Sequence, residues 1–183
     1  EKNIYWVLLP FMFGFAFLSK QVPAAYIIIS VIFILFLFSI VKKNFKWLKY
    51  FFIGLVTLII SVFALGHFQE ISFSSFLDQY ILYPQSIREQ RFDNFSFNIG
   101  GVLNHFKFIY LSLLPLFFIN LKNIFVEKKY FKQNDFYIFL SIFFLTFSLI
   151  FHQLLTKNQT FIFFLIPLLI AFSHMSISSY KFS

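Results

Sequence analysis

The sequence lacks cysteine and has little charge. Cysteine is absent from all 183 residues, so the chain carries no disulfide, no thiolate nucleophile and no cysteine-based metal site. Charged residues make up 12% of the sequence, against about 25% in a soluble domain. Apolar residues make up 60%, more than one small core could hide. This balance excludes an ordinary soluble globule and a disordered segment.

Several sequence patterns are also missing. There is no glycine-rich phosphate loop, which argues against a nucleotide-driven motor. The histidines do not stand four residues apart, so we expect structural residues at the membrane interface and no zinc site. No acidic or basic residue lies near the middle of an apolar run, which argues against an ion-coupled transporter. The histidines are His67, His105, His152 and His174.

Six apolar runs dominate the sequence. A bilayer-crossing helix needs about 20 residues, and continuous rather than alternating apolar runs indicate helices instead of barrel strands. We therefore predict an all-α, polytopic membrane helix bundle of about six transmembrane helices, forming a single membrane domain over residues 1–183. The first and fourth runs are short for a crossing. The predicted spans are 4–19, 23–41, 48–66, 106–121, 136–155 and 160–178.

Basic residues exceed acidic ones by 15 to 7, a net charge of +8. They form clusters between apolar runs, which indicates membrane topology rather than a nucleic-acid partner. Strict alternation of six spans places ten of them on one face and five on the other, and the richer face is cytoplasmic by the positive-inside rule. The ten are Lys2, Lys42, Lys43, Lys46, Lys49, Lys122, Lys128, Lys129, Lys132 and Lys181; the five are Lys20, Arg88, Arg91, Lys107 and Lys157.

This topology predicts a multi-pass protein of a bacterial inner (cytoplasmic) membrane, with membrane lipid as its surroundings. Aromatic residues beside the basic loops are expected to anchor the helices at the lipid headgroups. The expected anchors are Trp47, Tyr50, Tyr130 and Tyr137.

The outer face has one long loop, residues 67–105. Apolar residues recur at helical spacing over residues 73–81, which predicts an amphipathic helix lying in the membrane plane. Pro84 is expected to end this helix. Ser86 and Glu89 have the spacing of a capping box for a second short helix, and Gly100-Gly101 is expected to form a turn.

Arg88 and Arg91 stand three residues apart on one face of that second helix, where their planar guanidinium groups could hold a lipid-linked phosphate. They could equally pair with Glu89 and Asp93 or with lipid headgroups. Lys20 and Lys157 each lie in a very short outer loop. They either extend to the outer headgroups or face an anionic substrate.

Four stretches of the sequence resemble membrane glycosyltransferases of the GT-C class, the aminoarabinose transferase and protein O-mannosyltransferase group. FGFAFLSKQVPA at residues 13–24 is similar to that group's G-L-A-F-L-T-K-G-P stretch. FLDQY at 76–80, followed by Arg91-Phe92, resembles its outer-loop helix. NHFK at 104–107 and TKNQTF at 156–161, followed by Ile166-Pro167, resemble the starts of later spans. Gln21-Val22-Pro23 in place of Gly-Pro is a departure, as are Gln85, Ser86 and Glu89 where acidic and histidine residues often stand.

The resemblance implies an integral membrane glycosyltransferase that moves a sugar from a polyprenyl-phosphate carrier to an envelope acceptor on the outer face. Lys20, Arg88, Arg91 and Lys157 would bind the lipid phosphate. The catalytic acidic residue of the group lies in an earlier loop, together with any divalent metal. The chain starts at Glu1 instead of Met, so we expect that loop upstream and no catalytic residue in this chain.

Two other functions fit the same composition. The chain could belong to a polytopic flippase or permease for lipid-linked saccharides without transferase activity, or to a membrane scaffold without a substrate. An upstream outer loop with paired acidic residues would favour the enzyme.

Overall fold

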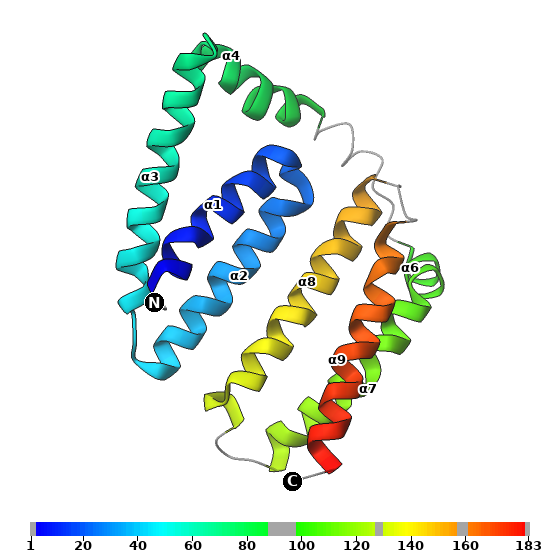
Figure 1. Ribbon diagram of the computed structural model, residues 1–183. Coiled ribbons are helices and arrows are strands. Elements are labelled where there is room, and N and C mark those ends of the chain that lie inside the picture. The colour runs from blue at the N-terminus through cyan, green and yellow to red at the C-terminus, as the bar shows by residue number, and fades with distance from the viewer. Residues whose placement is uncertain (1–2, 88–97, 127–129, 157–160, 182–183) are drawn as a thin grey trace. The chain divides into compact units, whose positions relative to one another are not determined.

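The computed structural model describes residues 3–87, 98–126, 130–156 and 161–181. Every regular element in these ranges is a helix, which confirms the all-α prediction (Figure 1). The longer helices are α1 (Asn3–Ser19), α2 (Gln21–Lys42), α3 (Lys46–Phe68), α7 (Lys107–Val126), α8 (Asn134–Thr156) and α9 (Leu165–Lys181). The shorter elements are α4 (Phe73–Leu77), the π-helical turn η1 (Asp78–Leu82), α6 (Ile99–His105), and the 3₁₀ turns η2 (Tyr130–Lys132) and η3 (Phe161–Phe164).

Four helices in the described ranges are long and apolar enough to cross a bilayer. They are α2, α3, α7 and α8, with 22, 23, 20 and 23 residues. Helix α1 has 17 residues. The other shorter apolar helix, Ile162–Ser178, combines most of η3 with most of α9. Helix α7 extends beyond the predicted fourth span, 106–121, and continues past Lys122 to Val126; the long stem of such a lysine can reach the interface. Six crossings stay a prediction.

The chain divides into two compact units, Glu1–Ile28 with Lys43–Asn94, and Ile29–Lys42 with Phe95–Ser183. In the first unit α1 and α3 pack side by side and run in the same direction. The rings of Trp6 and Trp47 lie 5.7 Å apart between centroids, and those of Phe13 and Phe51 lie 6.4 Å apart. Further along α3, Gly54 lies against the backbone of α1. Close backbone approach at a small residue is typical of helix packing in membranes.

In the second unit α8 packs against residues 29–42 of α2 and runs antiparallel to them. The rings of Phe38 and Tyr137 lie 4.9 Å apart between centroids, and those of Phe33 and Phe144 lie 6.1 Å apart. Helices α7 and α9 run parallel, joined by a hydrogen bond of 2.9 Å from Ser173 Oγ to the backbone oxygen of Ser112.

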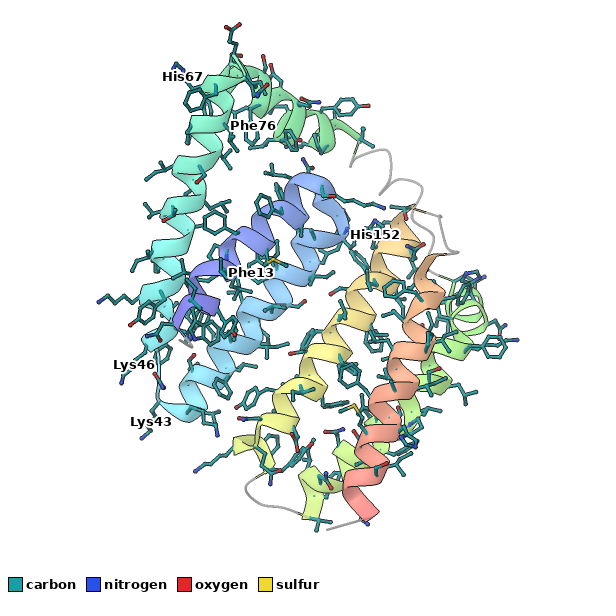
Figure 2. The ribbon with its side chains drawn as sticks, in the orientation of Figure 1. Phe13, Lys43, Lys46, His67, Phe76 and His152 are labelled. Atoms are coloured by element: carbon teal, nitrogen blue, oxygen red, sulfur yellow. The ribbon has the colours of Figure 1, made fainter. Side chains whose placement is uncertain are left out.

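Helix directions within each unit agree with spans that alternate across a bilayer. Alternation requires the first span to run parallel to the third, the fourth parallel to the sixth, and the second antiparallel to the fifth. Helices α1 and α3 run parallel, as do α7 and α9, whereas α8 runs antiparallel to residues 29–42 of α2. Figure 2 shows Lys43 and Lys46 at one end of the first unit, and His67 and Phe76 at the other. The basic end is the one predicted to face the cytoplasm.

The outer loop contains more helix than the sequence predicted. The helix expected over 73–81 is present as α4 and η1, and helical backbone then continues through residues 83–87. Pro84 therefore does not end it. Gly100 and Gly101 do not form a turn either: they lie in the first turn of α6, where both backbone N–H groups donate to the Asn98 side chain that caps the helix.

Three of the four expected interfacial aromatics are buried in protein. Trp47, Tyr130 and Tyr137 are 6%, 2% and 7% exposed, so these rings contact neighbouring helices instead of lipid headgroups. Trp47 and Tyr137 each have an aromatic partner that is distant in the sequence, Trp6 and Phe38. Tyr50 is half-buried.

Candidate functional site

Lys20 lies exposed at the corner between α1 and α2. Its backbone N–H still donates to Ala16, at 2.9 Å, so the α1 pattern reaches this residue. Two residues later Val22 leaves the helical region, with φ −115° and ψ 121°, because the ring of a following proline disfavours helical backbone at the preceding residue. Pro23 thus sets the corner that places Lys20 at the end of α1.

Gln21 connects this corner to the outer-loop helix. Its side-chain Nε2 donates to the backbone oxygen of Tyr80 at 2.6 Å. The Gln21 amide therefore contacts the outer-loop helix at the π-helical turn Asp78–Leu82, a kind of turn often found at functional sites.

The outer-loop helix rests on the first unit by one face. Phe76, Leu77, Tyr80, Pro84 and Ile87 are half-buried, whereas most of the other side chains of this segment are exposed. The rings of Phe76 and Tyr80 stack with centroids 4.9 Å apart. The amphipathic pattern of the sequence is therefore used for docking onto protein as well as for any contact with lipid.

Of the four predicted phosphate-binding residues, the structure places Lys20. Arg88, Arg91 and Lys157 lie outside the described residues. Gln21, the neighbour of Lys20, contacts Tyr80, eight residues before Arg88 in the sequence. In the sequence, Gln21 differs from the family pattern, but its contact with the outer loop was not predicted.

Gln21→Leu is expected to loosen the outer-loop helix. A hydrogen bond of this kind contributes about 0.5–1.5 kcal/mol, so backbone amides around Tyr80 and Tyr83 should exchange with deuterium roughly two- to tenfold faster. Hydrogen exchange followed by mass spectrometry of the purified protein in lipid nanodiscs measures this effect.

Gln79→Leu is the matched control, since Gln79 is an exposed glutamine in the same segment. In the Gln79→Leu variant, the backbone amides near Tyr80 should exchange at the wild-type rate. Equal exchange in the two variants would mean that the Gln21 amide does not hold the loop.

A buried polar pair occupies the last turns of α8, and its histidine is labelled in Figure 2. His152 and Gln153 are 2% and 0% exposed, and Gln153 Nε2 lies 3.4 Å from His152 Nδ1. Within the described part of the chain, Gln153 Oε1 is buried without a hydrogen-bond partner. His152 is buried, as expected of a structural histidine, and its position at the membrane interface stays a prediction. His67, His105 and His174 are exposed.

A cavity of about 470 Å³ lies between α7, α8, α9 and η2. Ligand-binding cavities commonly measure about 300–1,000 Å³. Apolar residues form one part of its wall, Leu116, Phe139, Ile142 and Phe172 among them. The polar residues of the wall are Asn120, Asn123, Tyr130, Gln133, Asp135 and Ser176.

The polar part of the cavity was not predicted. Asn120 and Asn123 interrupt the apolar pattern of α7 three residues apart, a spacing that puts both on one helix face. That spacing was the available signal. Asn120 lies inside the predicted span 106–121 and Asn123 lies two residues beyond it, so the two were not considered together.

No group of three or more histidine, aspartate or glutamate side chains that could hold a metal ion occurs among the described residues. Any metal expected from the family resemblance concerns residues upstream of the chain, and that expectation stays a prediction.

No protein-family model, no curated protein and no solved structure matches the chain. Its class therefore rests on the helices themselves. With four described helices able to cross a bilayer and 60% apolar residues, the chain is an α-helical membrane protein.

Proposed function

We propose that this chain is the membrane-embedded part of a glycosyltransferase that moves a sugar from a polyprenyl-phosphate carrier to an envelope acceptor on the outer membrane face. The proposal starts from the four stretches that resemble the GT-C class. Its structural support is that the first two stretches contact each other, and that the third contacts the 3₁₀ turn η3, which begins at the last residue of the fourth.

In the first unit, Gln21 of the 13–24 stretch donates to Tyr80 of the 76–80 stretch. In the second unit, the end of α6 contacts η3: the rings of His105 and Phe163 lie 5.9 Å apart between centroids. Phe106 and Ile162 beside them are fully buried. Segments that form a common site must meet in the fold, and the first two stretches do so within the first unit.

Lys20, Arg91 and Lys157 then act on the carrier phosphate. As the bond between sugar and phosphate breaks, negative charge grows on the departing phosphate, and cationic groups already in place stabilise it more than they stabilise the ground state. The corner made by Pro23 holds Lys20 at a helix end, where an ammonium group can reach the headgroup region. The acidic base that this reaction needs is the one that the resemblance assigns to an earlier loop.

The deciding experiment uses the longer protein reconstituted in vesicles with labelled polyprenyl-phosphate sugars. Transfer releases one polyprenyl phosphate for each label that leaves the lipid fraction, and this stoichiometry can be measured without knowing the acceptor. Label that crosses the bilayer while still attached to its carrier would favour the flippase or permease instead. Carrier that stays intact and on the face where it was supplied would contradict both functions.

A further inference from the structure

We propose that the cavity between α7, α8 and α9 binds a lipid with an uncharged, hydroxyl-bearing headgroup, such as a sugar, with the first part of its alkyl chain directed into the bundle. This site lies within the second unit and does not depend on the proposed transferase activity.

Each of the three helices changes from apolar to polar toward the same end of the cavity. On α7 the wall runs from Leu116 to Asn123, on α9 from Phe172 to Ser176, and on α8, which runs in the opposite direction, from Ile142 back to Asp135. This arrangement fits an amphipathic molecule whose headgroup lies at the polar end and whose alkyl chain lies in the apolar part.

The polar end suits hydroxyl groups. Amide side chains such as Asn123 and Gln133 offer both donors and acceptors, and a sugar hydroxyl also both donates and accepts. Asp135 is the single charged residue of the described wall, and no lysine, arginine or histidine of the described residues lines it. A carboxylate with no cation beside it in the wall repels a phosphate, which favours a neutral headgroup over an anionic one.

Asn120 is held in a fixed orientation at the polar end. The hydroxyl of Tyr130 donates to its Oδ1, and its Nδ2 donates to the backbone oxygen of Leu116 at 2.7 Å. Asn120 is 4% exposed and Tyr130 is 2% exposed. Buried polar groups that are oriented before a ligand arrives cost less to order on binding, so this pair forms the rigid floor of the headgroup site.

The cavity lies at the opposite end of α8 from the 156–161 stretch. Asp135 is in the first turn of this 23-residue helix and Thr156 is its last residue, so the two ends are about 33 Å apart. By the predicted topology the headgroup would lie on the cytoplasmic side. The site is therefore separate from the one proposed for the carrier phosphate.

Photolabelling tests the proposal directly. The 183-residue chain in phosphatidylcholine nanodiscs is exposed to octyl β-glucoside that carries a diazirine in its alkyl chain. We expect saturable labelling of peptides from α7 and α9 that line the cavity. Excess unlabelled octyl β-glucoside should remove the labelling, whereas octyl phosphate and octylamine should not.

Two variants and one control locate the site. Ile119→Trp fills the cavity and should reduce labelling at least tenfold. Asn123→Leu should reduce labelling by a similar factor, because it removes a side-chain amide proposed to bind the headgroup. Phe118→Trp changes the adjacent residue, which is 58% exposed, and should label like the wild type. If Ile119→Trp fails to fold, Asn123→Leu and the competition decide. Labelling that persists in Asn123→Leu, or that octyl phosphate or octylamine also removes, would overturn the proposal.

Discussion

Lys20→Ala in the longer protein is expected to lower the rate of sugar transfer about 10²-fold, because removing one preorganised group that stabilises charge in a transition state commonly costs about 10²–10³ in kcat. The lower figure applies because Lys20 is exposed and water shields part of its charge. The effect should fall on kcat more than on KM, since the phosphate gains charge only as the sugar leaves. Arg91→Ala is expected to lose at least as much, because a guanidinium binds two phosphate oxygens at once.

Lys49→Ala is the control for these variants. It removes the same charge from an exposed position on α3, near the end predicted to face the cytoplasm, and should transfer sugar at the wild-type rate. Membrane insertion should be unchanged in all three proteins. Transfer that survives Lys20→Ala would exclude this residue from the phosphate site, and a loss in Lys49→Ala of the same size would indicate a general charge effect.

Gly54→Ala is expected to destabilise the contact between α1 and α3 by about 2–3 kcal/mol, the upper part of the usual range for overpacking. A Cβ at this position would lie 2.9 Å from the backbone carbon and 3.0 Å from the Cα of Val7. These are backbone atoms, which cannot move aside by a side-chain rotation. The helices must separate, and Gly54→Leu should separate them further.

Two other glycines provide a graded comparison. A Cβ at Gly14 would lie 2.6 Å from a terminal methyl of Leu58, which can rotate away, so Gly14→Ala should cost about 1 kcal/mol. A Cβ at Gly66 meets its nearest atom at 3.9 Å, and Gly66→Ala should stay within about 0.5 kcal/mol of the wild type.

The protein contains a natural reporter for this series. Its two tryptophans, Trp6 and Trp47, contact each other across the α1–α3 interface, so fluorescence during titration with sodium dodecyl sulfate follows this interface alone. The sodium dodecyl sulfate concentration at the unfolding midpoint should be highest for Gly66→Ala, lower for Gly14→Ala and lowest for Gly54→Ala. A Gly54→Ala midpoint equal to that of Gly66→Ala would show that the helices have room for a methyl group.

Part of the candidate site was predictable from the sequence. The short outer segment at Lys20 follows from the two apolar runs on either side, and the helix over 73–81 follows from its apolar spacing. The contact of Gln21 with Tyr80 was not predictable, because it joins residues 59 positions apart in the sequence.

Local composition was enough to establish that the chain is helical and belongs in a membrane, since the transfer of each apolar run into lipid depends on that run alone. The ends of the helices were less certain: Lys122 and the two asparagines beside it concealed the last turn of α7. The tertiary structure decided which helices pair, that Gly54 lies against the α1 backbone, and that three polar-ended helices enclose a cavity. These features depend on the shapes and hydrogen bonds of side chains from distant segments, and no property of a single run carries that information.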